Sequence, residues 1–257
     1  EVIRLSEALG RREGLDTAYA QLAELLGQVE QYGEAEEAAE EWVNLLREKG
    51  VSEDELAEAW ERLARFALAA KDWQRMDEAY RHSIDIYTEM GDRQRQFEVT
   101  EAYALALENS GQYRKALEVF RDLLEMGEGF GQETVIRQQL RIARLQRLYF
   151  NRYEEAEEVL RTAIERAGRA GLDDVVVEAR LSLVRVLEMV ARFDEALSIL
   201  QEIVTEAESA DATATLAEVA LERANIHWLR AEYFESFREQ QRALDLARKV
   251  DDEAIIF

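Results

Sequence analysis

The sequence predicts an all-α fold, a solenoid of about six antiparallel helix pairs. An aromatic residue recurs at positions 32, 73, 113, 153, 193 and 233, in steps of 41, 40, 40, 40 and 40 residues. Apolar residues on both sides of each aromatic follow the three- and four-residue spacing of a helix. The 257 residues include no proline, a residue that breaks helix interiors. A period of this length indicates supersecondary units that bury their apolar faces by stacking.

Each predicted unit consists of a helix A, a short turn at the aromatic, a helix B and a longer turn. Leu183, Val186 and Leu187 show the helical spacing before an aromatic, and Leu200 and Ile203 show it after the same aromatic. Glycine marks the expected turns at the ends of helices B. The predicted repeats span approximately residues 15–50, 53–91, 93–131, 132–171, 172–210 and 212–250.

Two further positions recur in register with the aromatic. Nine residues before it stand Ala23, Ala64, Ala104, Arg144, Val184 and Ala224, and three residues after it stand Ala35, Met76, Ala116, Ala156, Ala196 and Ser236. Small side chains at these positions allow helices A and B of one pair to approach closely, and the aromatic is expected to pack at their turn. Arg144 and Val184 replace the small residue, which predicts looser packing in the fourth and fifth pairs.

This small–aromatic–small spacing resembles the tetratricopeptide repeat family over nearly the whole chain. The most specific stretch is G-x-Y-x-x-A-L-x-x-F, from Gly111 to Phe120. The unit of about 40 residues is longer than the usual repeat and lacks its frequent closing proline, as in the extended repeats of bacterial regulators, peptide-sensing receptors and scaffold proteins. The resemblance implies a right-handed superhelical solenoid whose helices A line a concave surface that grips a peptide.

The whole chain is predicted to be one such solenoid. Residues 1–13 look like a helix B without its partner, and residues 251–257 look like the start of another helix A. We therefore expect a fragment of a longer protein, with apolar end faces that favour self-association. The sequence starts with neither a methionine nor a signal peptide, and a cytoplasmic location is expected.

Composition excludes several kinds of site. The net charge of −23 argues against nucleic-acid and membrane-surface binding, which depend on clustered lysine and arginine. No cysteine is present, and the two histidines lie in different repeats, so no metal site or cofactor is predicted. The acidic clusters at the starts of helices B are interpreted as solvated faces favoured by the helix dipole. No catalytic constellation appears, and the sequence predicts a protein that is not an enzyme.

The candidate binding residues lie where the resemblance places the concave face of helices A. Asn225 falls where members of the family that clamp a peptide often carry asparagine. Counting the inner positions gives nine acidic and three basic residues, which favours a basic or amphipathic-helical partner. The candidates are Glu61, Arg65, Glu101, Asn109, Arg141, Tyr149, Arg185, Asn225 and Trp228.

Two functional hypotheses follow from these residues and from the resemblance. The first is a protein–protein interaction scaffold that binds a peptide or protein, in keeping with repeats that cover nearly the whole chain. The second is a ligand- or peptide-sensing regulatory domain that controls an attached kinase or transcription regulator.

Overall fold

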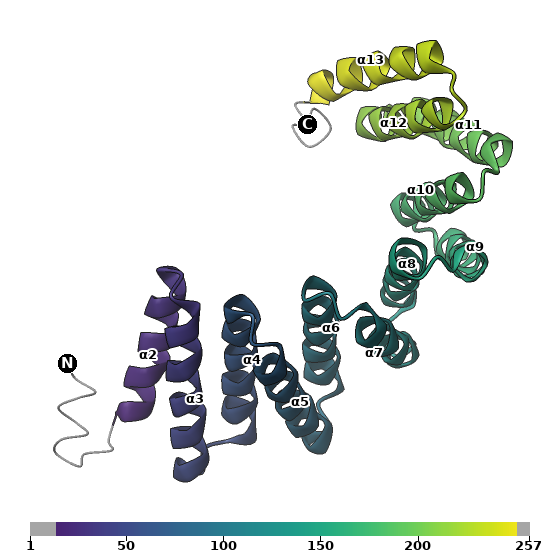
Figure 1. Ribbon diagram of the computed structural model, residues 1–257. Helices are drawn as coiled ribbons and strands as arrows, with labels where there is room; N and C mark the ends of the chain where they lie inside the picture. The colour runs from purple at the N-terminus through teal and green to yellow at the C-terminus, as the bar shows by residue number, and fades with distance from the viewer. Residues whose placement is uncertain (1–13, 251–257) are drawn as a thin grey trace. The chain divides into compact units, whose positions relative to one another are not determined.

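The computed structural model describes residues 14–250, which form twelve α-helices and no strand. The prediction of an all-α fold is confirmed. No helix in this part of the chain is long and apolar enough to cross a bilayer. The helices, labelled in Figure 1, are α2 (Leu15–Gln28), α3 (Tyr32–Lys49), α4 (Glu53–Ala70), α5 (Trp73–Met90), α6 (Arg93–Asn109), α7 (Tyr113–Gly127), α8 (Gln132–Tyr149), α9 (Tyr153–Ala170), α10 (Asp173–Met189), α11 (Phe193–Ser209), α12 (Thr213–Leu229) and α13 (Tyr233–Val250).

The recurring aromatic marks the start of every second helix. Tyr32 begins α3 and Phe193 begins α11, and the other four aromatics begin α5, α7, α9 and α13 in the same way. The even-numbered helices are therefore the predicted helices A, and the odd-numbered helices are the predicted helices B. Most of these aromatics are half-buried, although Tyr233 is 60% exposed.

The turns inside the pairs use left-handed backbone, mostly without glycine. The turn after each helix A places a residue with positive φ two positions before the aromatic, namely Glu30, Lys71, Gly111, Asn151, Ala191 and Ala231. An L-residue in this conformation costs roughly 1–2 kcal/mol. Closing hydrogen bonds such as Gln112 N to Leu107 O, 2.8 Å, offset part of that cost. The predicted glycine turns occur mainly between pairs, for example at Gly50 and Gly91.

Side-chain caps help to start several helices. Ser52 Oγ accepts a hydrogen bond from the Glu55 backbone N–H at the start of α4, with an O–N distance of 3.3 Å. Asp72 caps α5 in the same way, through a 3.0 Å bond from the Arg75 backbone N–H. Each cap satisfies one of the donors that a helix leaves unpaired in its first turn.

Buried residues, small in most pairs, lie between the two helices of each pair, as the spacing predicts, although Met76 is a large one. The position three residues after the aromatic is at most 2% exposed in all six pairs. The position nine residues before it is at most 3% exposed in five pairs, in which it is Ala23, Ala64, Ala104, Val184 and Ala224. Val184 is larger than the alanine found in most of the other pairs, yet it is also fully buried. Its greater size therefore does not open this position to solvent.

Helix α8 departs from the predicted register by one residue. Arg144 is exposed, and Ala143 takes the small buried position, with 1% of its surface exposed. The turn after α8 explains the shift, because Arg152 N donates to Gln146 O, six residues back, whereas the corresponding bond spans five residues in the other pairs. One extra residue in this turn moves every α8 side chain one place relative to Tyr153. The interpretation of Arg144 as a packing position is therefore wrong.

The chain divides after Met126 into two compact units. Unit 1 ends at Met126 and holds α2 to α6 and nearly all of α7, whereas unit 2 starts at Gly127 and holds α8 to α13. The single array over residues 1–257 stays a prediction. The partial repeats expected at 1–13 and 251–257 lie outside the described residues.

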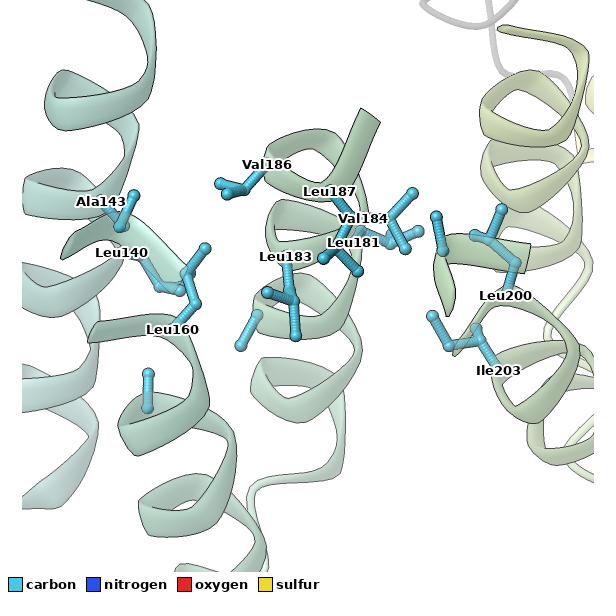
Figure 2. Close-up of a cluster of buried hydrophobic side chains, with 14 of the residues drawn as sticks. Leu140, Ala143, Leu160, Leu181, Leu183, Val184, Val186, Leu187, Leu200 and Ile203 are labelled. Carbon is cyan, nitrogen blue, oxygen red and sulfur yellow. The ribbon is translucent and has the colours of Figure 1, made fainter. Parts of the chain in front are cut away.

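Unit 2 has a continuous apolar core that runs through five successive helices, from α8 to α12. Figure 2 shows Leu140 of α8, Leu160 of α9, Leu183 of α10 and Leu200 of α11 within this cluster. Each of these side chains is at most 7% exposed. The core fixes the positions of α8 and α10, whose opposite faces carry the polar side chains described next.

Candidate binding surface

The candidate surface is the inner face, defined as the side of helices A that points away from their helix B partners. All nine candidate residues lie on helices A. Six of them are exposed and three, Glu61, Glu101 and Arg141, are half-buried. They are placed as Glu61 and Arg65 on α4, Glu101 and Asn109 on α6, Arg141 and Tyr149 on α8, Arg185 on α10, and Asn225 and Trp228 on α12.

In unit 1 the inner face is acidic and partly paired. Glu61 lies 4.0 Å from Arg65, one turn further along α4. Glu58 on the same helix binds Arg95 of α6 at 2.7 Å. Glu101 lies on α6 about two turns before Asn109. The acidic excess of the inner face stays a prediction, and two of its acidic candidates, Glu61 and Glu101, lie in this unit.

In unit 2 two polar contacts join the inner faces of α10 and α12. Arg185 Nε lies 2.6 Å from Glu222 Oε1, and Asn225 Nδ2 donates to Glu188 Oε2 at 2.6 Å. Two of the candidates, Arg185 and Asn225, are thus held by carboxylates of the neighbouring repeat. Since their partners are fixed by helix packing, both side chains have defined positions.

Glu188 has a pKa well above the ordinary value for glutamate. It is only 8% exposed. Burial, together with the nearby charge of Glu222, raises the pKa of the Glu188 carboxyl to about 7, although the hydrogen bond from Asn225 and the charge of Arg185 oppose this shift. The carboxyl is consequently only partly ionised near neutral pH.

We expect Glu188→Gln to stabilise the protein at pH 8 and to have little effect at pH 4. An acid with a raised folded-state pKa destabilises the fold as it ionises, so its cost is absent below about pH 4.5, grows up to pH 7 and is complete above that. The shift corresponds to at most roughly 3 kcal/mol, and we expect about 1–2 kcal/mol because nearby solvent and cations relax the site. Urea unfolding at both pH values measures it, with exposed Glu202→Gln as the control. An equal effect at both pH values would contradict this assignment.

A pocket of about 370 Å³ opens on the inner face between α8 and α10. Its floor is apolar and comes from Leu140 and Ala143 of α8, Leu160 of α9 and Val186 of α10, which Figure 2 shows in the same region of the core. Its walls are polar and mostly basic. They are formed by Arg137, Arg141, Arg144, Arg147, Glu178, Ser182 and Arg185.

Three of these arginines, Arg137, Arg144 and Arg147, were not among the candidates from the sequence. The register counted back from Tyr153 is one residue out along α8. It equates Leu145, which is fully buried, with Arg185 and Asn225, which stand at the same distance before their own aromatics. The sequence contains a pattern that predicts this cluster of arginines. Arg137, Arg141, Arg144 and Arg147 are spaced by four, three and three residues, which places them on one side of a helix.

The arginines of the pocket influence one another. Burial lowers the pKa of the Arg147 guanidinium, and the nearby positive charge of Arg185 lowers it further. Arg147 remains a cation, because the pKa of arginine starts above 12. Like charges are therefore crowded at this point of the inner face.

Trp228, which is not among the residues lining the pocket, contacts Tyr233 across the turn between α12 and α13. Its ring meets that of Tyr233 edge-on, with centroids 5.1 Å apart. Phe234 is 69% exposed and Phe237 is 58% exposed. Tyr149, at the end of α8, is also 40% exposed. These side chains offer apolar contact area beside the polar inner face.

The histidines and acids form no evident metal site within residues 14–250, where no group of three or more potential ligands comes together. His82 stacks on Trp60 with ring centroids 4.4 Å apart. His227 Nδ1 lies 2.6 Å from Glu232 Oε2 at the end of α12.

Comparison with solved structures identifies the fold. BtubC from P. vanneervenii superposes with a TM-score of 0.63 at 17% identity, over 88% of this chain and 92% of that one. A putative kinesin light chain with TPR-like repeats from Podosopora anserina gives 0.59 at 19% identity, over 77% and 98%. This chain has the tetratricopeptide-repeat fold. The fold class expected from the sequence is thereby confirmed.

Other tetratricopeptide-repeat neighbours and a family model complete the comparison. A Rap protein solved in complex with competence and sporulation factor gives a TM-score of 0.52 at 15% identity, over 93% of this chain and 76% of that one. A family model described as Cohesin loading factor matches residues 131–257, just under half of the chain and nearly all of unit 2. A search of curated proteins found no match.

Proposed function

We propose that this protein is a non-catalytic interaction scaffold that holds a peptide or protein partner on the inner face of its helices A. The single observation that carries the proposal is the pocket between α8 and α10, a concave site on that face with an apolar floor and polar walls. Ligand pockets are concave sites of a few hundred Å³ in which apolar surface is combined with polar groups that orient the ligand. Two of the nine candidate residues, Arg141 and Arg185, line the pocket.

The likeness to a Rap protein that was solved with a bound factor supports the same proposal. Its identity of 15% limits that support to the fold. The exposed aromatic Trp228 provides the kind of side chain that anchors a partner at an interface. The predicted preference for a basic partner stays a prediction and concerns the inner face of unit 1, where the acidic residues gather.

Site-specific photo-crosslinking tests this proposal. We expect a photoreactive amino acid at Arg65 or Trp228 to trap a discrete partner in extract of the source cells. The same group at Glu118 of α7 or Ser198 of α11 serves as the control, because both positions lie on helices B. Each crosslinked product is then identified by mass spectrometry. Crosslinks from the helix B positions alone would contradict the choice of face.

A second candidate is a sensing role, in which a bound peptide changes the arrangement of the repeats and so controls an attached effector. A signal-transduction ATPase from Pyrococcus horikoshii described as carrying a tetratricopeptide repeat sensor has the same fold, with a TM-score of 0.57 at 14% identity over 98% of this chain and 43% of that one. Small-angle neutron scattering with a partner that is matched to the solvent by deuteration distinguishes the two, since a passive scaffold keeps its own radius of gyration.

A further inference from the structure

The charge of the pocket between α8 and α10 is opposite to that of the chain. The protein carries 55 acidic and 32 basic residues, yet five arginines and one glutamate line this pocket. Four of the arginines come from one side of α8, and Arg185 comes from α10. Clustered positive charge beside a low-dielectric floor strengthens the local potential and favours an anionic ligand.

The arginines of the pocket repel one another, and a bound anion would reduce this repulsion. Arg147 is half-buried, and the proximity of Arg185 makes its charged form less favourable. Glu133 binds Arg137 at 2.7 Å, Glu222 binds Arg185 at 2.6 Å, and Glu178 is the one carboxylate among the lining residues. A ligand carboxylate placed among the guanidinium groups would gain charge-assisted hydrogen bonds and reduce their mutual repulsion.

The apolar floor narrows the class of ligand. Leu140, Ala143, Leu160 and Val186 present hydrocarbon at the base of the pocket, and a small inorganic anion leaves such a surface uncovered. A peptide can contact both the apolar floor and the arginine wall, because one apolar side chain covers the floor while neighbouring acidic side chains reach the arginines. The volume of about 370 Å³ is sufficient for such a side chain and its flanking groups.

We propose that the pocket between α8 and α10 binds an acidic segment of a protein partner, with an apolar side chain on the floor and carboxylates against the arginine wall. This inference rests on the proposed scaffold function and specifies the chemistry of its partner. It assigns to unit 2 a preference opposite to the basic partner expected from the total charge of the inner positions.

Fluorescence anisotropy with short labelled peptides tests this inference on the full chain. The probe is an acetylated pentapeptide with a central leucine flanked by two glutamates on each side. Matched peptides carry glutamine or lysine in place of glutamate, and unlabelled pyrophosphate is the competing small anion. We expect the glutamate peptide to bind most tightly, with an affinity that falls as salt rises.

The decisive variant is the double substitution Arg144→Gln with Arg147→Gln. We expect it to weaken binding of the glutamate peptide by about tenfold to a hundredfold, as loss of one or two charge-assisted contacts implies. Arg114→Gln with Arg238→Gln removes two arginines from helices B, outside the pocket, and is expected to leave binding unchanged. Far-ultraviolet circular dichroism verifies that each variant is folded.

Three results would overturn the inference: equal binding of the glutamine peptide, preferential binding of the lysine peptide, or an unchanged affinity in the α8 double variant. Pyrophosphate that competes as strongly as the glutamate peptide would also overturn it, because the site would then recognise a free anion. None of these results affects the crosslinking test of the scaffold, in which a partner is trapped at Arg65 or Trp228 whatever its charge.

Discussion

Leu145→Ala is expected to lower the free energy of unfolding by about 3 kcal/mol. The Leu145 side chain is fully buried in the structure, so its truncation removes apolar contacts and leaves a cavity. The aromatic spacing alone places this residue on the exposed inner face, where truncation would cost roughly 0.5 kcal/mol or less. Urea denaturation followed by circular dichroism separates these values.

A matched pair of substitutions checks the same register in the opposite direction. Ala143→Leu inserts bulk at a position that is 1% exposed and should destabilise the protein by about 1–3 kcal/mol. Arg144→Leu, one residue later, should be nearly neutral because that side chain is exposed. Loss of stability in Arg144→Leu but not in Ala143→Leu would restore the register that the aromatics predict.

Phe120→Ala should have the largest effect on stability, about 3–5 kcal/mol. Phe120 closes the stretch that most resembles the tetratricopeptide repeat, and its side chain is fully buried on α7. Phe120→Leu keeps an apolar side chain of similar size and should cost less than half as much. The difference in the midpoint of urea unfolding between the two variants measures this, and a cost below about 1 kcal/mol for Phe120→Ala would contradict the burial of this ring.

Much of the fold could be predicted because the repeat imposes the same packing several times. The aromatics mark the first residues of α3, α5, α7, α9, α11 and α13, and the small residues that follow them, such as Ala116 and Ala196, are fully buried. A helix needs side chains of a given size at a given spacing wherever it packs on a partner. The sequence displays that requirement directly, and the structure agrees with it.

The binding surface was less predictable, because it depends on turn length as well as on period. The extra residue after α8, seen in the bond from Arg152 N to Gln146 O, leaves the aromatic spacing at 40 while it moves the α8 side chains by one place. The register taken from the aromatics therefore misassigns Arg144, although Arg141 still lines the pocket. Helical spacing within α8 alone places the arginines on one side, but only the structure shows that Arg185 of the next helix A faces the same pocket.

The sequence also does not show which residues of the inner face pair with one another. Asn225 was predicted from its position in the repeat, whereas its bond to Glu188, 37 residues earlier, comes from the packing of α12 on α10. The raised pKa of Glu188 follows from the same packing, which buries the carboxyl near Glu222. Such properties depend on three-dimensional neighbours that helical spacing does not specify.

The most direct test of the central claim, that the pocket between α8 and α10 on the inner face holds an acidic segment of a partner, is a crystal structure of this protein with the glutamate peptide. We expect the leucine of the peptide to lie on Leu140 and Val186, with carboxylate oxygens about 3 Å from guanidinium nitrogens of Arg144, Arg147 or Arg185. A peptide bound on the exposed side of helices B, or one that leaves these arginines without contact, would contradict it.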